Sequence, residues 1–134
     1  VNLYPGPADL EAIVDEVVAM LTEKGRLASS FIAASAEVID RVALVEPKLA
    51  CCLLGKEAVD PNYPQLSLDH GCLILQPSNT IVTPELCAKA HELGQTVHPF
   101  YADDVAEMKR LIACGVDGIL TNEPALLVQV LKGA

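Results

Sequence analysis

Short runs of apolar, largely β-type residues alternate with helical segments along this chain of 134 residues, and that alternation limits the folds it can adopt. In each helical segment the apolar residues recur every three to four positions, the spacing of a helix with one buried face. Helices of this length between strands imply right-handed β-α-β units and therefore a parallel sheet. We expect six strands, at residues 1–4, 27–31, 49–54, 71–76, 96–100 and 118–120.

Some of the segments between these strands carry local signals. Thr83 before Pro84 predicts the start of a helix, because threonine is a good N-cap and proline suits the first helical position. Residues 56–65 contain two prolines and an asparagine, and we expect them to be irregular. Residues 115–118, Gly-Val-Asp-Gly, are interpreted as a tight turn from a helix into the last strand.

Composition narrows the fold class further. Hydrophobic residues make up 51% of the chain and aromatic residues 4%, so the core consists of Val, Leu, Ile and Ala, as in a parallel sheet with helices on both faces. The length indicates one domain, residues 1–134, whereas a complete (β/α)8 barrel usually takes about 250 residues. We therefore expect an α/β fold, a partial TIM-type barrel of about six parallel strands alternating with helices.

Charge and cysteine content exclude several classes of protein. The formal net charge of −9 argues against a nucleic-acid partner, because phosphate binding needs clustered Lys and Arg. No apolar run is long enough for a membrane span. The five cysteines are an odd number without a Cys-x-x-Cys pair, so we expect buried, reduced thiols and a cytoplasmic location. The chain begins at Val1 rather than Met, which suggests processing or truncation.

Polar and aromatic residues follow the last two expected strands. Phe100, Tyr101 and Asp103 end one strand, and Thr121 and Asn122 end the next. The carboxyl ends of strands face the reaction site in a parallel barrel, so Phe100, Tyr101 and Asp103 are candidate substrate-binding residues. The alternative for Phe100 and Tyr101 is ordinary packing of the barrel. The alternative for Asp103 is an N-cap for the helix beginning at residue 105, and Thr121 and Asn122 have a similar capping alternative.

A second candidate lies further upstream. Ser30, near the end of the second expected strand, is a candidate hydrogen-bonding residue for a substrate. No base is placed to activate it, so a serine nucleophile is not expected. The three histidines are expected to be structural or exposed: His70 before a strand, His91 within a helix and His98 in the middle of a strand.

Two motifs near the end of the chain carry a family resemblance. They are Gly94-x-x-Val97-x-x-Phe100-Tyr101-x-Asp103 and Gly115-Val-Asp-Gly-Ile-Leu-Thr-Asn122. In this order and spacing the motifs resemble the C-terminal part of glycerophosphodiester phosphodiesterases, which have an aromatic strand tip with Asn and then a Gly-Val-Asp-Gly-Ile-x-Thr-Asp segment. Upstream, Ala28-Ser-Ser-Phe31 is similar to a Ser-Ser-Phe strand of that family.

The resemblance implies hydrolysis of glycerophosphodiesters to glycerol 3-phosphate and an alcohol with a divalent metal, Mg²⁺ or Ca²⁺. The family's His-Arg-Gly, Glu-x-Asp and His-Asp segments, which hold the catalytic histidines and most metal ligands, have no counterpart here, and Tyr4 and Gly6 stand where the family has Glu and Lys. No catalytic residue and no metal ligand is therefore expected in this chain, which alone would be inactive.

Alternatives remain open. The chain is either the C-terminal part of such a barrel or a non-catalytic descendant that binds a small ligand or a partner, and another phosphate-handling (β/α) barrel is a further possibility. Six strands without the two that close a barrel leave unpaired edges. With the high mean hydropathy of +0.36, these edges predict self-association or a missing N-terminal part.

Overall fold

The computed structural model describes residues 1–3, 6 and 8–133 and shows short strands alternating with helices. The strands are β1 (Asn2–Leu3), β2 (Phe31–Ala34), β3 (Ala50–Leu53), β4 (Ile74–Leu75) and β5 (Thr96–Val97). The helices are α1 (Leu10–Glu23), α2 (Ala36–Val45), α3 (Tyr63–Asp69), α4 (Pro84–Glu92), α5 (Val105–Cys114) and α6 (Pro124–Leu131). Single 3-10 turns at Leu27–Ser29, Lys56–Val59 and Asn79–Ile81 complete the elements.

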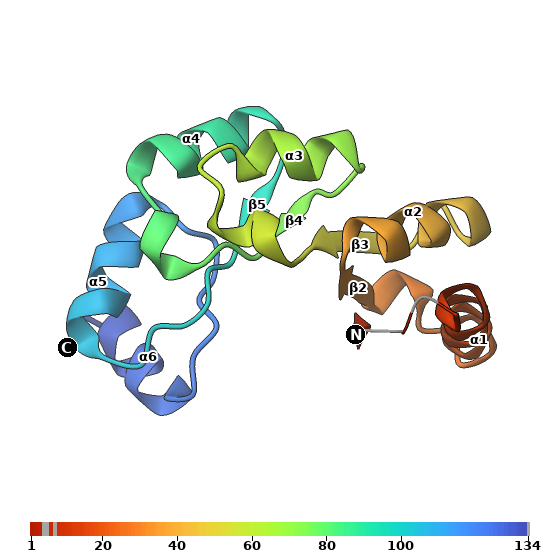
Figure 1. Ribbon diagram of the computed structural model, residues 1–134. Helices are drawn as coiled ribbons and strands as arrows, with labels where there is room; N and C mark the ends of the chain where they lie inside the picture. The colour runs from red at the N-terminus through yellow and green to blue at the C-terminus, as the bar shows by residue number, and fades with distance from the viewer. Residues whose placement is uncertain (4–5, 7, 134) are drawn as a thin grey trace.

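All the strand pairs are parallel, as the sequence predicted. β2 lies between β1 and β3, with Asn2 opposite Ala33 and Ile32 opposite Cys51, and β4 pairs separately with β5. Figure 1 shows the strands following one another along an arc, with the helices on its outer side and the two chain ends well apart. The arrangement is an open part of a (β/α) barrel, so the expected α/β fold class is confirmed.

The second expected strand and the segment between the third and fourth strands differ from the sequence expectation. Residues 27–29 form a 3-10 turn rather than a strand, and β2 begins only at Phe31, because residues 31–34 are the ones that pair with β3. The segment expected to be irregular contains α3. Pro64 is compatible with that helix because it occupies the first turn, where its missing N–H has no helical acceptor.

The last two strands are shorter than expected. β5 ends at Val97, and Phe100 then makes only single bridges, one to Ser78 and one to Leu120. The sixth expected strand is reduced to that bridge at Leu120. Pro99 has no N–H to donate to a ladder, which limits regular pairing around it. The path of a sixth parallel strand is present, but its ladder is not.

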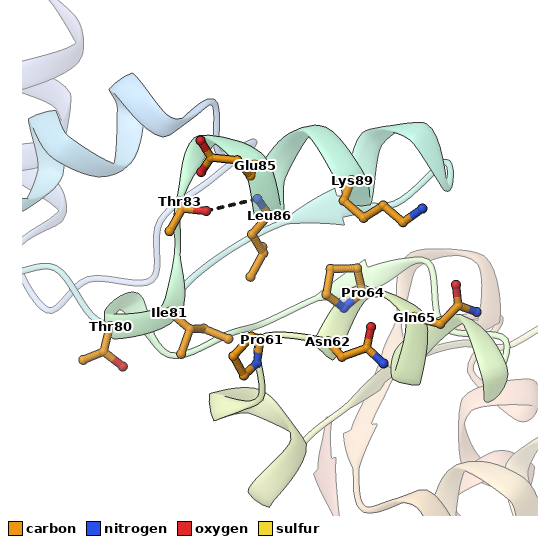
Figure 2. A pocket seen from close by; sticks show the side chains of 10 residues that line it. All are labelled: Pro61, Asn62, Pro64, Gln65, Thr80, Ile81, Thr83, Glu85, Leu86 and Lys89. Atoms are coloured by element: carbon orange, nitrogen blue, oxygen red, sulfur yellow. Dashed lines mark hydrogen bonds between the residues drawn. The ribbon is translucent and has the colours of Figure 1, made fainter.

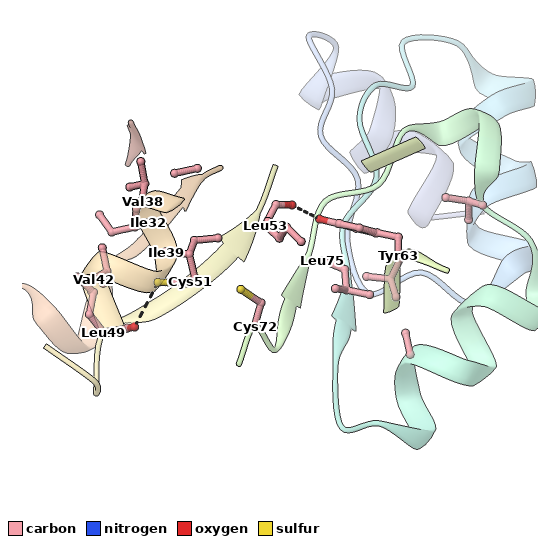
Figure 3. Close-up of a cluster of buried hydrophobic side chains, with 14 of the residues drawn as sticks. Ile32, Val38, Ile39, Val42, Leu49, Cys51, Leu53, Tyr63, Cys72 and Leu75 are labelled. Atoms are coloured by element: carbon pink, nitrogen blue, oxygen red, sulfur yellow. Dashed lines mark hydrogen bonds between the residues drawn. The ribbon is translucent and has the colours of Figure 1, made fainter. Parts of the chain in front are cut away.

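The core lies between the strands and the outer helices. Helix α1 buries Val14, Val18 and Leu21 at helical spacing, and Figure 3 shows side chains of α2 and β2 packed together with residues of β3. Burying three such aliphatic side chains stabilises the fold by roughly 1.5–3 kcal/mol each. The expected cap of α4 is confirmed, because Thr83 Oγ1 accepts a hydrogen bond from the Leu86 amide at 3.2 Å.

The five cysteines are free thiols, four of them buried, as expected. Burial raises the pKa of Cys51 and Cys52 to about 11 and that of Cys72 to about 12. These groups therefore remain protonated at neutral pH and behave as small hydrophobic side chains.

Candidate functional site

The carboxyl ends of the strands form a common rim, and a cavity of about 210 Å³ opens there. Its walls combine side chains from four strand ends with an aromatic pair and the turn after β3. The lining residues are Asn2, Leu54, Gly55, Ala58, Gln76, Phe100, Tyr101 and Leu120. Gly55 has a φ of 124°, which a residue with a side chain would rarely adopt, and this conformation lets the chain turn sharply at the cavity wall.

The two aromatic residues predicted from the sequence both line this cavity. The rings of Phe100 and Tyr101 meet edge to face, with centroids 5.5 Å apart and planes at 61°, and the peptide bond between them is cis. Tyr101 is 57% exposed, so much of its ring is available for contact. The structure therefore places Phe100 and Tyr101 where the sequence predicted them, at a strand tip facing a hollow.

Asn79, in the turn after β4, holds the backbone of this aromatic pair. Its amide N–H donates to the Phe100 carbonyl and its side-chain Nδ2 donates to the Tyr101 carbonyl, both at 2.9 Å. Arg110 of α5 in turn donates to the carbonyls of Asn79 at 2.8 Å and Val82 at 2.9 Å. Sequence reasoning missed this support, since nothing in the local pattern brings Asn79 and Arg110 together.

Glu107 orients the Arg110 guanidinium. Two hydrogen bonds join them, from Nε to Oε2 at 2.7 Å and from Nη2 to Oε1 at 2.6 Å. Hydrogen bonding to Arg110 lowers the pKa of Glu107 below its ordinary value. The charged pair is thus a scaffold for the rim rather than a reactive group.

Asp103 lies beside the cavity and not in its wall. One carboxylate oxygen accepts from the Thr121 hydroxyl at 3.0 Å and the Asn122 amide at 2.7 Å, and the other accepts from Asn122 Nδ2 at 2.8 Å. These bonds, led by the Asn122 side chain, lower the pKa of Asp103. The alternative that Asp103 caps α5 is wrong, because Asp104 is the cap and accepts from the Glu107 amide at 2.9 Å.

Ser30 lies at the other end of its strand. It was expected near the carboxyl end, but β2 starts at Phe31 and runs to Ala34, so Ser30 precedes the strand. In a parallel sheet this puts Ser30 at the amino end, away from the rim that Phe100 and Tyr101 occupy. The expected position of Ser30 was wrong because the apolar run before it forms a 3-10 turn.

The Gly-Val-Asp-Gly turn before the sixth strand is held by its aspartate. Asp117 Oδ2 accepts from the Val97 amide at 2.8 Å and contacts His91 Nε2 at 2.9 Å, and these bonds outweigh burial and lower the pKa of Asp117. His98 directly follows β5, its Nε2 is 3.0 Å from Thr96 Oγ1, and its ring lies against Gly118. His70 contacts Asp40 at 2.8 Å. These contacts give each of the three histidines a hydrogen-bonding partner, and His98, expected in the middle of a strand, lies just after β5.

The cavity wall contains amides and aromatic rings but no charged side chain among the described residues. Asn2 and Gln76 supply the polar side chains, which can donate hydrogen bonds to hydroxyl groups and accept them. Gln76 could have been predicted from the sequence, since it directly follows the fourth apolar run. The same rule, that residues at the carboxyl ends of strands face the site, identified Phe100. Such a wall suits a neutral polyol or alcohol better than a phosphate group.

The described residues do not fit a divalent metal. Hard cations such as Mg²⁺ and Ca²⁺ are bound mainly by carboxylate and carbonyl oxygens. Across residues 1–3, 6 and 8–133 no three His, Cys, Asp or Glu side chains gather as a possible metal site. Asp103 already accepts three hydrogen bonds. Tyr4, which stands at the family's Glu position, lies outside the described residues, and Gly6 offers no side chain.

A larger hollow of about 480 Å³ lies on the outer surface between α3 and α4. Figure 2 shows Pro61, Pro64 and Ile81 around it, with Lys89 on the α4 side and the Thr83 cap at the start of that helix. It is larger than the rim cavity but is not the candidate site, because catalytic groups of parallel barrels lie at the carboxyl ends of the strands rather than between outer helices.

The fold and the rim together define an incomplete parallel (β/α) barrel with a hollow at the carboxyl ends of its strands. Residues 8–126 match the sequence model of the glycerophosphoryl diester phosphodiesterase family. Because this match covers most of the chain, the chain belongs to that family. The family assignment inferred from the strand-tip motifs is confirmed, and the alternative of an unrelated phosphate-handling barrel is set aside.

Individual relatives agree with this assignment. A glycerophosphodiester phosphodiesterase of Caldanaerobacter subterraneus subsp. tengcongensis is 28% identical over 131 residues, covering 97% of this chain and 51% of the relative. A protein structure from Silicibacter pomeroyi, whose name assigns it to the same family, has a TM-score of 0.88 at 24% identity. The match covers 98% of this chain and 49% of the other chain. A phosphodiesterase of Oleispira antarctica, solved with the product sn-glycerol 3-phosphate, has a TM-score of 0.79 at 13% identity, covering 98% and 53%.

The chain therefore spans about half the length of the relatives it matches. The structural similarity extends over nearly all of this chain, which agrees with an incomplete barrel. Within the described part of the chain, every helix is too short or too polar to cross a membrane.

Proposed function

We propose that this chain supplies the glycerol-facing wall of a glycerophosphodiester-binding site. The observation that carries the proposal is the neutral lining of the rim cavity, to which Asn2 and Gln76 contribute amides and Phe100 and Tyr101 contribute aromatic rings. Amide groups can pair with glycerol hydroxyls, while aromatic rings can cover the C–H faces of a polyol.

Asp103 supports this wall from behind. It ties the loop after β5 to the loop after the sixth strand through Thr121 and Asn122, which restrains the loop that carries Tyr101. Ser30 is not included in the wall, because it lies at the amino end of β2. The proposed ligand contacts are thus Phe100, Tyr101, Gln76 and Asn2, with Asp103 as a residue that positions the loops.

The activity implied by the family is hydrolysis of a glycerophosphodiester to glycerol 3-phosphate and an alcohol. Such chemistry needs general acid–base groups within hydrogen-bond reach of the scissile bond. The cavity wall carries none among the described residues, and the described residues do not fit Mg²⁺ or Ca²⁺. We therefore infer that the 134-residue chain binds without turning over its ligand, and that hydrolysis needs residues from additional polypeptide.

The test is an NMR titration of the labelled chain with sn-glycerol 3-phosphate and, separately, with inorganic phosphate. The amides of Gln76, Phe100 and Tyr101 should shift with sn-glycerol 3-phosphate and much less with phosphate alone. Tyr101→Ala should weaken these shifts, whereas Lys89→Ala in the outer hollow should leave them unchanged. Shifts confined to the surroundings of Lys89, or equal shifts with phosphate, would contradict the proposal.

The open ends of the arc carry a second part of the proposal, self-association through the edge strands. Within the described chain the outer edge of β1 has no partner strand, and on the other side Leu120 makes a single bridge. Unpaired strand edges favour pairing with another chain. Sedimentation velocity at tens of micromolar should show dimers or larger species, and a single monomer boundary would contradict this part.

The five free thiols support a cytoplasmic location.

A further inference from the structure

The strands β3 and β4 are neighbours along the arc, yet no ladder joins them. The described strands divide into two sheets, β1-β2-β3 and β4-β5, and the division falls between β3 and β4. The two strands still lie beside each other in the fold. In a regular parallel barrel the carbonyls of one strand would accept directly from amides of the next. The gap between these two strands therefore needs another group to satisfy the facing backbone atoms.

The phenol of Tyr63 occupies that gap. The hydroxyl donates to the Leu53 carbonyl at the end of β3 and accepts from the Gln76 amide directly after β4, the second bond at 3.2 Å. Figure 3 shows the side chain of Tyr63 reaching from its helix to Leu53. Tyr63 is fully buried, and burial raises the pKa of its phenol, so the hydroxyl keeps the proton that it donates.

The position of Tyr63 is itself fixed by the surrounding structure. It begins α3, and its amide donates to the Asp60 carbonyl at 2.9 Å. Gln95, which is 2% exposed, donates through Nε2 to the Pro64 carbonyl at 2.9 Å and to the Cys72 carbonyl at 3.0 Å. The first turn of α3 is thus tied to the segment leading into β4, and the ring has little freedom to withdraw from the gap.

The bridge lies directly beneath the rim cavity. Leu54 follows the carbonyl that Tyr63 binds, Gln76 carries the amide that it accepts from, and both residues line the cavity. With an oxygen atom interposed between carbonyl and amide, the strands are further apart than in a direct ladder. Leu54, Gly55 and Ala58 line the cavity from the β3 end of the bridge, and Gln76 lines it from the β4 end.

We propose that the phenol of Tyr63 sets the spacing of β3 and β4 and thereby holds open the rim cavity, which makes Tyr63 a positioning residue for the ligand. The role in ligand binding rests on the proposed function, whereas the role in strand spacing does not. Loss of the hydroxyl leaves the Leu53 carbonyl and the Gln76 amide without their partner, so these two groups either approach each other or open to solvent.

The test compares the full chain with Tyr63→Phe, which keeps the ring and removes the bridge, and with the control Cys52→Ala. The Cys52 sulfur contacts the same phenol oxygen at 3.8 Å, but its removal leaves both bridging bonds intact. Amide hydrogen exchange measured by NMR reports each group separately. The Leu54 amide, which donates to Ala34 at 2.8 Å, serves as an internal reference.

In Tyr63→Phe we expect the Gln76 amide to exchange about tenfold faster or to change its partner with a clear chemical-shift change, while the Leu54 amide changes little. The dissociation constant for sn-glycerol 3-phosphate should rise several-fold in the same variant. Cys52→Ala should change neither quantity. Should Tyr63→Phe fail to fold, a nuclear Overhauser contact between the Tyr63 hydroxyl proton and the Gln76 amide proton in the unaltered chain tests the bridge directly.

Each outcome decides a separate point. Unchanged exchange and shift of the Gln76 amide in Tyr63→Phe, or no Overhauser contact in the unaltered chain, would overturn the spacing role. A Gln76 response with an unchanged dissociation constant would overturn the role in ligand positioning. If the unaltered chain does not bind sn-glycerol 3-phosphate while Gln76 responds, the spacing role stands and the proposed function fails.

Discussion

Replacing Gly118 with alanine tests the packing of the sixth strand against the fifth. A Cβ built at Gly118 would lie 2.6 Å from Nδ1 and 3.3 Å from Cε1 of His98. Ordinary contacts between such atoms are about 3.5–4.0 Å, so the imidazole must retreat by about 1 Å. The ring is not free to do so without loss, because Nε2 lies within hydrogen-bond distance of Thr96 Oγ1 at 3.0 Å.

The size of the effect follows from the surroundings of the ring. Overpacking a closed core costs about 1–3 kcal/mol. Here the imidazole borders a hollow of about 240 Å³, into which it can turn, so the lower half of that range applies. Glycine-to-alanine replacement also reduces the conformational entropy of the unfolded chain. This stabilises the folded chain by about 0.4–1 kcal/mol and so offsets part of the overpacking cost. The net expectation for Gly118→Ala is a loss of about 1 kcal/mol, or roughly 4 °C in Tm for a chain of this length.

Urea denaturation followed by circular dichroism measures this difference. Gly6→Ala is the matched control, because its Cβ would meet no atom within 4 Å. The double variant His98→Ala with Gly118→Ala removes the ring that causes the clash. Gly118→Ala should therefore destabilise the unaltered chain but cost little in the His98→Ala background. An equal cost in both backgrounds, or a Gly118→Ala variant as stable as Gly6→Ala, would refute the reasoning.

Three further outcomes are expected. Because hydrogen bonds lower the pKa of Asp103, the stabilisation by its carboxylate is present above the ordinary aspartate pKa and is lost as the pH falls through the lowered pKa. The chemical shift of the Asn122 amide in an NMR pH titration should follow this loss. Asp103→Asn should abolish the pH-dependent shift. Thr83→Ala should destabilise the chain by about 1 kcal/mol in urea denaturation, whereas Thr80→Ala should have a smaller effect, because Thr83 caps α4. Iodoacetamide at pH 8 should label half-buried Cys114 first, with mass spectrometry showing full labelling only in urea for the buried thiols Cys51, Cys52, Cys72 and Cys87.

Much of the fold could be predicted because periodicity and caps are local signals. The α4 segment shows this, since Thr83 and Pro84 specify a helix start that depends only on neighbouring residues. The errors arose where tertiary pairing decided the outcome. Leu27 and Ala28 before Ser30 are compatible with a strand, yet β2 begins later because residues 31–34 are the ones that pair with β3. Helix α3 was not predicted, because the two prolines in residues 56–65 suggested an irregular segment. Pro64 nevertheless lies in the first turn of that helix.

The site was predicted in part for the same reason. Phe100 and Tyr101 stand at the end of the fifth expected strand, shortly after β5, so the rule about strand ends located them. The partners of Asp103 could not be deduced, because Thr121 and Asn122 are distant in sequence and any of several caps was equally compatible with the pattern. The bridging role of Tyr63 depends on a gap between two strands, which no local pattern reports.

The central claim is that this chain contributes a binding wall but not the catalytic groups of its family. Hydrolysis of glycerophosphocholine by the purified 134-residue chain, with Mg²⁺ or Ca²⁺ added and glycerol 3-phosphate release measured, tests it most directly. No release above a blank without protein is expected. Release that follows the chain through successive purification steps would contradict it.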